Sequence, residues 1–128
     1  MNLGIQYEIT EFVNEQNTAS SYGSGLLPVY ATPAMIALME KCACACVAPH
    51  LEDGTTTVGT CINVRHISAS PLGIKITCTA TLIETDGRKL TFKVEAKDEA
   101  GLIGEGTHER FIIDTERFMT KCKSKLSI

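Results

Sequence analysis

The stretch ATPAMIALMEKCACACVAPHL, residues 31–51, has a helical pattern and decides the fold. Thr32 is a suitable helix N-cap, Pro33 suits the first helical position and Pro49 would stop the helix, so we expect one helix of about 15 residues. Its apolar side chains are nearly continuous, with alanines and cysteines between them. Because most of the circumference of such a helix must be covered by protein, we expect it to be the central helix of the molecule.

Extended segments flank this helix on both sides. Residues 5–13 alternate apolar and polar side chains, which predicts a strand with one buried face. After the helix come four more extended segments, residues 55–67, 74–84, 89–98 and 102–114, with a strong hairpin signal at Asp86-Gly87. The order predicts an α+β fold in which one long helix packs against a curled antiparallel sheet, with the last four strands as a meander. In two of these strands the inward side chains should be Ile74, Ile76, Cys78, Ala80 and Leu82, then Leu90, Phe92, Val94 and Ala96.

The length of 128 residues suits a single domain, residues 1–128. Residues 14–26 are rich in Asn, Ser and Gly, so we expect a mobile loop or lid there, and residues 118–128 are expected to form a solvated C-terminal tail. A net charge of −3 and 44% hydrophobic residues argue against a disordered chain and against a basic nucleic-acid binder. No apolar run approaches the roughly 20 residues that span a bilayer, and the N-terminus lacks a leader pattern. We therefore expect a cytoplasmic protein with no membrane or nucleic-acid partner.

Three cysteines two residues apart, in KCACACVAPH at residues 41–50, raise the question of a metal site. At about 100° per residue, Cys44 points away from Cys42 and Cys46, which lie one turn apart. Three ligands cannot converge from that helix, and the chain contains no C-x-x-C pair to supply others. We therefore expect no metal, and free thiols that act as small side chains and let another element approach the helix closely.

Three polar residues occur where the pattern predicts apolar surroundings. Glu40 is the only acid of the helix, and an ionised carboxylate there would be costly without partners. His66 has the same strand parity as Val58, Ile62 and Val64, so its imidazole should point toward the helix. Thr32 stands at the helix N-terminus, where free N–H groups and the macrodipole favour negative charge.

Each of the three also has a plain structural explanation. Thr32 can be only a cap, His66 a satisfied core histidine, and Glu40 a carboxylate that reaches water. Their combination favours chemistry, because a hydroxyl at a helix N-terminus, an imidazole and an acid in an apolar setting are the groups that acyl transfer needs.

The segments VYATPAMIALME, VGTCINVRHISASPLG and GEGTHERFIID, found in this order between about residues 28 and 114, resemble the fluoroacetyl-CoA thioesterase-like family. The resemblance implies a hot-dog dimer that hydrolyses acyl-CoA thioesters without a metal or organic cofactor. It implies that Thr32, Glu40 and His66 are catalytic. It further implies that Gly59 and Arg110 contact the substrate or order the site.

The sequence leaves more than one acyl group and more than one function compatible with this resemblance. Fluoroacetyl selectivity is doubtful, because the segment before the helix, SYGSGLLPVY, lacks the phenylalanines that close the acyl pocket of the fluoroacetyl enzyme. The acyl group is therefore left as small or medium. Arg110 could instead be a surface strand arginine, and His108 is expected to be an ordinary strand histidine. The alternatives to a thioesterase are a hot-dog enoyl-CoA hydratase or dehydratase and a non-catalytic acyl-CoA binder.

Thr32 and Glu40 are separated by eight residues, roughly 12 Å of helix rise, so they cannot hydrogen-bond directly. The candidates to bridge them are His66, the substrate or a residue of a second subunit. A homodimer with the site at the subunit interface is therefore expected.

Overall fold

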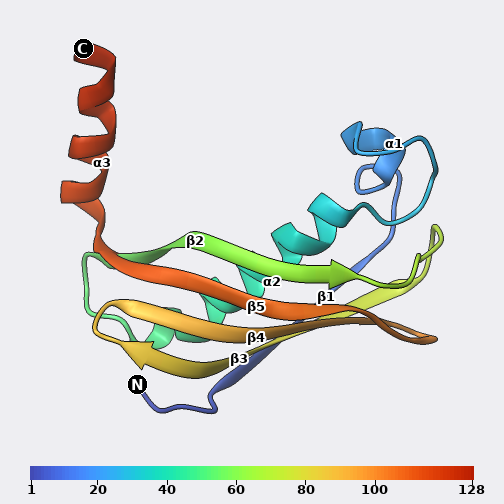
Figure 1. Ribbon diagram of the computed structural model, residues 1–128, viewed down its shortest axis with the longest axis horizontal. Helices are drawn as coiled ribbons and strands as arrows, with labels where there is room; N and C mark the ends of the chain where they lie inside the picture. The colour runs from blue at the N-terminus through green and yellow to red at the C-terminus, as the bar shows by residue number, and fades with distance from the viewer.

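The computed structural model describes all 128 residues (Figure 1). The strands are β1 (Gln6–Phe12), β2 (Thr55–His66), β3 (Lys75–Asp86), β4 (Lys89–Asp98) and β5 (Gly101–Asp114). The α-helices are α1 (Ala19–Tyr22), α2 (Thr32–Val47) and α3 (Thr115–Lys123), and two 3₁₀ segments, η1 (Ala48–His50) and η2 (Ser124–Ser127), follow α2 and α3. None of the helices has the length and apolar character needed to cross a bilayer.

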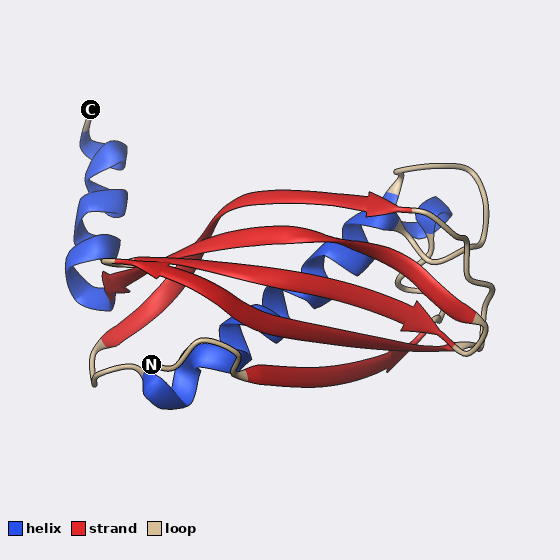
Figure 2. Cartoon of the chain, turned by 60° about the horizontal axis from the view of Figure 1, so that its bottom comes forward, coloured by secondary structure: helices blue, strands red, loops and turns tan.

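The five strands form one antiparallel sheet in the order β1-β3-β4-β5-β2. Helix α2 crosses one face of this curled sheet diagonally (Figures 1 and 2). The predicted α+β hot-dog arrangement, a long helix wrapped by an antiparallel sheet, is therefore confirmed.

The strand order differs from the predicted four-strand meander. Only β3, β4 and β5 form a meander, whereas β2 pairs with β5 and lies at the edge of the sheet. The segment between β2 and β3 is not a hairpin, because it carries the chain from one edge to a position between β1 and β4. Val29 bridges Pro71 in this connection. Consequently, one side of β2 has no strand partner within the chain.

The core lies between α2 and the inner face of β3 and β4. The inward residues predicted for these strands are confirmed: Ile74 is half-buried, and the remaining eight are at most 1% exposed. Cys42 and Cys46 point toward the sheet, with their Sγ atoms 3.3 Å from the carbonyl oxygen of Tyr7 and 3.6 Å from that of Ile5. Cys44 is only half-buried, as the helical geometry predicts. Small thiols thus allow β1 to approach the helix closely, although Tyr7 itself is 44% exposed and β1 is buried less completely than predicted.

Helix α2 departs from the prediction in two ways. Ala31 is the N-cap and Thr32 is the first helical residue, so the Thr32 hydroxyl does not cap the helix. The helix is also not covered all round, because one stripe remains exposed or half-buried beside β2. The stripe consists of Thr32, Ile36, Ala37, Glu40, Lys41 and Cys44.

Gly104 of β5 sets how closely the first turn of α2 approaches the sheet. It lies opposite His66 in the β2–β5 register. A Cβ atom at this position would lie 2.5 Å from Sδ of Met35 and 2.8 Å from the carbonyl oxygen of Arg65, which is too close for van der Waals contact. Met35 therefore occupies the space that a side chain at position 104 would need.

Residues 14–26 are not an entirely exposed loop. They contain α1, which is capped by Thr18 through a 3.2 Å hydrogen bond from the Ser21 N–H to Oγ1. Asn17 is buried, and its side-chain amide is satisfied there, since Oδ1 accepts the Asn14 N–H at 2.8 Å and Nδ2 donates to the carbonyl of Phe12 at 3.0 Å. The C-terminal tail is also structured: α3 begins at Thr115, so most of residues 118–128 are helical, although all of them are exposed.

Candidate active site

Thr32 and His66 meet at the end of the sheet where α2 begins. Thr32 is the first residue of α2 and His66 the last residue of β2. Their Oγ1 and Nδ1 atoms are 2.8 Å apart, which is a hydrogen bond. The ring of Tyr30 stands edge-on to the imidazole, at a centroid distance of 6.4 Å and an interplanar angle of 82°. The predicted inward direction of His66 is confirmed.

Burial lowers the pKa of His66, because a charged imidazole would lose hydration there. The ring is therefore neutral near pH 7. When its Nδ1 accepts the Thr32 O–H, the proton of the neutral ring sits on Nε2. That atom is buried and has no hydrogen-bond partner in the chain. His66 is thus a base that already accepts the Thr32 hydroxyl at Nδ1, and its Nε2–H lacks an acceptor.

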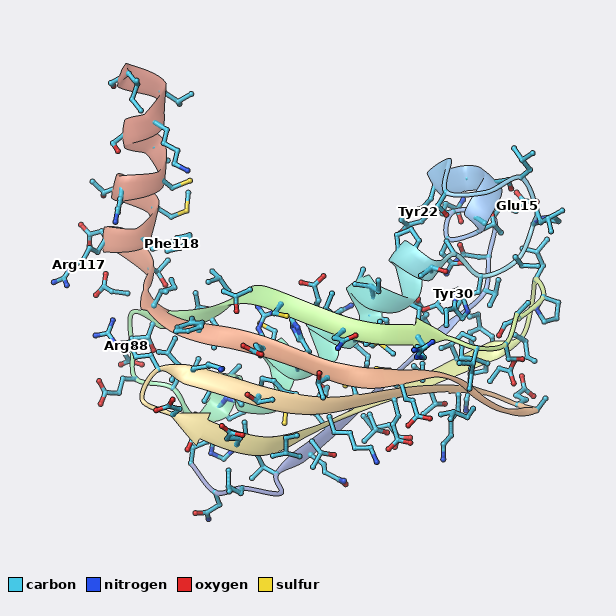
Figure 3. All side chains as sticks on the ribbon, viewed as in Figure 1. Glu15, Tyr22, Tyr30, Arg88, Arg117 and Phe118 are labelled. Carbon is cyan, nitrogen blue, oxygen red and sulfur yellow. The ribbon has the colours of Figure 1, made fainter.

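A cavity of about 270 Å³ opens beside this pair. Tyr30 forms part of its wall and is fixed by a 2.5 Å hydrogen bond from its hydroxyl to Oε2 of Glu11. Figure 3 shows Tyr30 and Tyr22 at this end of the molecule. The remaining lining residues are small or aliphatic, apart from two serines, so the cavity suits a short organic group. They are Ala19, Ser24, Val29, Ile67, Ser68 and Ala69.

A second polar cluster surrounds Arg110 on β5. The guanidinium donates from Nε to Oγ1 of Thr57 at 2.8 Å and from Nη2 to the Thr57 carbonyl at 3.0 Å. Its Nη1 lies 3.2 Å from Nε2 of His108 and 4.0 Å from Oε2 of Glu40. Arg110 is only 7% exposed, so the alternative of a surface strand arginine is wrong. Thr57 and His108 thus hold the guanidinium inside the protein, and the partly exposed Glu40 lies between it and the solvent.

His108 is the residue of this cluster that the sequence did not reveal. It is buried, and its Nδ1 donates to the Cys61 carbonyl at 2.8 Å, which leaves Nε2 free to accept from Arg110. Burial lowers the pKa of His108, and the neighbouring guanidinium lowers it further. The available signal was its position two residues before Arg110, which places both side chains on one face of the strand.

Gly59 makes room for this cluster. A Cβ atom at position 59 would lie 2.8 Å from Oε2 of Glu40, 3.1 Å from Nη1 of Arg110 and 3.2 Å from Cε1 of His108. The absence of a side chain thus lets the carboxylate and the guanidinium approach each other over β2. The register of β2 also shifts between Gly59 and Cys61, so Val58 faces away from His66 and the shared face expected for them is wrong.

No three His, Cys, Asp or Glu side chains come together as a metal site would require, and all six cysteines are free.

The sequence of this chain matches a known family and a characterised relative. The family model described as fluoroacetyl-CoA-specific thioesterase matches residues 13–116. The chain belongs to this family. The fluoroacetyl-CoA thioesterase of Streptantibioticus cattleyicolor is 43% identical over 97 residues, which cover 76% of this chain and 70% of that protein. The enzyme class, a thioester hydrolase, follows from this membership.

Solved structures agree with the family and with the hot-dog fold. A fluoroacetyl-CoA-specific thioesterase superposes with a TM-score of 0.92 at 36% identity, covering 98% of this chain and 97% of that chain. A mutant of that enzyme in complex with fluoroacetate and CoA gives a TM-score of 0.87 at 35% identity, covering 92% and 99%. A thioesterase superfamily protein from Thermus thermophilus gives 0.89 at 27% identity, covering 98% and 96%.

The residues that the family resemblance implied fall into two groups in this chain. Thr32 and His66 are hydrogen-bonded at the cavity. Glu40, Gly59 and Arg110 lie together farther along α2 and β2. Within one chain, Glu40 makes no hydrogen bond to His66, so the single chain does not assemble all three groups proposed as catalytic.

Proposed function

We propose that this thioester hydrolase is an acyl-CoA thioesterase that converts a small or medium acyl-CoA to the free acid and CoA. The observation that carries the proposal is the 2.8 Å hydrogen bond between Thr32 and His66 at the edge of the 270 Å³ cavity. A hydroxyl held by a neutral imidazole is the arrangement that activates an oxygen nucleophile.

The chemistry assigns a role to each group at the start of α2. The imidazole of His66 removes a proton either from Thr32 or from a water held by Thr32, and that oxygen attacks the thioester carbonyl carbon. The helix N-terminus stabilises the oxyanion that forms. When the carbon–sulfur bond breaks, the imidazolium returns the proton to the CoA sulfur. In the Thr32 route, water then hydrolyses an acyl-threonine; detection of that ester by mass spectrometry distinguishes the two routes.

Glu40 completes the site when it comes from a second copy of the chain. The Nε2–H of His66 needs an acceptor, and a carboxylate both accepts it and stabilises the imidazolium during turnover. Glu40 of the same chain is about 12 Å from Thr32 along α2. Its side chain is 43% exposed in the uncovered stripe of the helix, so it is available to another copy.

The free edge of β2 supports a homodimer with the site at the interface. Antiparallel pairing of two β2 edges would cover the stripe of α2 and bring Glu40 of one copy toward His66 of the other. Arg110 and Gly59 would then hold Glu40 in place rather than contact the acyl group. Light scattering should give twice the chain mass, and a fully active monomer would exclude the interface site.

Mixing two inactive variants tests the shared site directly. His66→Ala and Glu40→Gln should each lose activity. Their heterodimer would contain one intact site, made of His66 from the Glu40→Gln chain and Glu40 from the His66→Ala chain. Co-expression with two affinity tags should therefore restore about half of the wild-type rate per dimer. No restoration would place all catalytic groups in one chain.

Release of free thiol from an acyl-CoA panel tests the function itself. The panel should run from acetyl and fluoroacetyl through branched, aromatic and long acyl groups. We expect the short acyl groups to be hydrolysed best, because the cavity is near the lower end of the range for small-molecule sites. Absence of thiol release from every member would refute the thioesterase. In that case, hydration of an enoyl-CoA or CoA binding without turnover would support the two alternatives.

A further inference from the structure

Helix α3 and η2 stand away from the sheet and are exposed along their whole length (Figures 1 and 3). Phe118, Cys122 and Leu126 follow at intervals of four residues and form an apolar stripe, with Phe118 40% and Leu126 89% exposed. Arg117 and Lys121 form a basic stripe beside it. An uncovered helix with these two stripes is unusual for a free surface and indicates that another molecule lies against it.

A cavity of about 160 Å³ lies at the base of α3. Its lining includes three cations, Arg88, Arg117 and Lys121, together with the ring of Phe118. None of the cations has a carboxylate within 4.0 Å, since the ion pairs of the chain involve other residues. The one acid in the lining, Asp114, accepts the Arg117 N–H at 2.9 Å as the N-cap of α3. Unpaired guanidinium groups beside an aromatic ring suit phosphates and a nucleobase.

This basic cavity is too far from Thr32 of its own chain to serve the same CoA molecule. The two lie at opposite ends of the sheet, as Figure 3 shows for Arg88 and Arg117 at one end and Tyr30 at the other. Strand β2, which runs between the two ends, has 12 residues and spans about 36 Å. That length exceeds the reach of the pantetheine arm between the thioester and the phosphates of CoA.

Two-fold pairing of β2 edges removes this separation. In an antiparallel pair, the register that places Gly59, and with it Glu40, opposite Arg65 of the other copy also places Thr55 opposite Ala69. Thr55 pairs with Asp114 in its own sheet, immediately before α3. The α3 helix of one copy would therefore stand next to the cavity lining of the other. The apolar stripe of α3 and η2 would then meet the exposed apolar side chains at that end of the other copy. These are Tyr22, Leu26, Leu27, Ile67 and Leu72.

We propose that α3 of one copy supplies the phosphate-binding part of the CoA site of the other copy, through Arg88, Arg117 and Lys121, with Phe118 beside the adenine. This inference rests on the proposed function and on the dimer that it requires. The pantetheine arm leads from the Thr32–His66 pair of one chain toward these cations of the second.

The test compares a full thioester with a truncated one. The double variant Arg117→Gln/Lys121→Gln should raise the KM for an acyl-CoA about tenfold with kcat unchanged, and should weaken the dependence of KM on salt. The KM for the matching acyl-N-acetylcysteamine, which has no phosphates, should not change. The control Lys75→Gln/Lys97→Gln removes the same charge from exposed strand positions and should leave both KM values as they are. Equal KM values for acyl-CoA in the wild type and the α3 variant would overturn the proposal.

Tagged heterodimers test whether α3 acts on the other copy. When His66→Ala and the α3 changes are in the same chain and its partner is wild type, the one active site should show the raised KM. When they are in different chains, the active site should show the wild-type KM. The opposite pattern would overturn the assignment. Calorimetry with CoA alone separates this result from hydrolysis: about tenfold weaker binding in the α3 variant supports the proposal, and equal affinity refutes it, whether or not the protein hydrolyses thioesters.

Discussion

Replacing Gly59 with alanine should separate activity from stability. The new Cβ would lie 2.8 Å from Oε2 of Glu40, so the carboxylate must move by several tenths of an ångström or more. Its side chain is 43% exposed and flexible, so this movement is cheap. The contacts with Arg110 and His108, at 3.1 and 3.2 Å, require smaller shifts.

The stability change is expected to be small. Gly59 does not have a positive φ, so alanine fits the backbone and gains about 0.5–1 kcal/mol by restricting the unfolded chain. The displaced contacts cost a similar amount, and the melting temperature should stay within about 5 °C of wild type. If Glu40 is catalytic, however, a displacement of several tenths of an ångström should lower kcat by about 10- to 100-fold, since misplacement by about 1 Å can cost about 100-fold.

The measurement pairs thermal unfolding with thiol release from the best acyl-CoA, with Cys61→Ala as a control on an exposed neighbour. Wild-type kcat in a stable Gly59→Ala variant would refute the idea that the position of Glu40 matters. A loss of more than 10 °C would mean that the methyl group meets atoms that cannot move.

Three further predictions concern the same site. Thr32→Ala should lower kcat at least 100-fold. It should change the free energy of unfolding by less than about 0.5 kcal/mol, because Thr32 is exposed and is not the N-cap. Thr32→Ser should keep measurable activity, and equal activity in both variants would exclude a role for the hydroxyl. Activity should fall as the pH drops through the pKa of His66, which is lowered below its usual 6.5. The free energy of unfolding should also fall below pH 6.5, because the unfolded chain then binds protons that the neutral His66 and His108 of the folded chain do not. Denaturant unfolding at pH 8 and pH 5 in wild type and His108→Asn measures this loss, and an equal loss in both proteins would contradict the assignment to His108. Arg110→Lys should lower the free energy of unfolding by about 2–4 kcal/mol and lower kcat, because lysine cannot bond Thr57 twice and reach His108 as well; an unaffected variant would show that charge alone is enough there.

Local patterns predicted the elements and their buried faces well. In β3 and β4 the strict alternation of apolar residues and the Asp86-Gly87 turn determine both the faces and the pairing, and both predictions are confirmed. The place of β2 was not predictable in this way, because its pairing with β5 joins residues about 50 positions apart and no turn signal encodes it. Likewise, the bulge that separates Val58 from His66 leaves no mark in the sequence.

The site was predictable only in part. The parity of His66 placed its side chain toward the helix, and its contact with Thr32 follows from where β2 ends relative to α2. The cap predicted for Thr32 was wrong because the helix begins one residue earlier than expected, at Thr32 with Ala31 as its cap, which leaves the hydroxyl free for His66. The burial of Arg110 and His108 depends on their tertiary neighbours, which alternation alone does not reveal.

The missing side chain at Gly104 bears on the reacting distance from the helix-facing side of the sheet. Gly104 is opposite His66 in the register and beneath Met35, which belongs to the same helical turn as Thr32. We therefore expect the depth to which Met35 packs against Gly104 to set the height of Thr32 above the imidazole. A laboratory evolution experiment that varies only positions 35 and 104 would adjust that height without altering any group that faces the substrate, and would show how much catalytic rate depends on the thickness of the core.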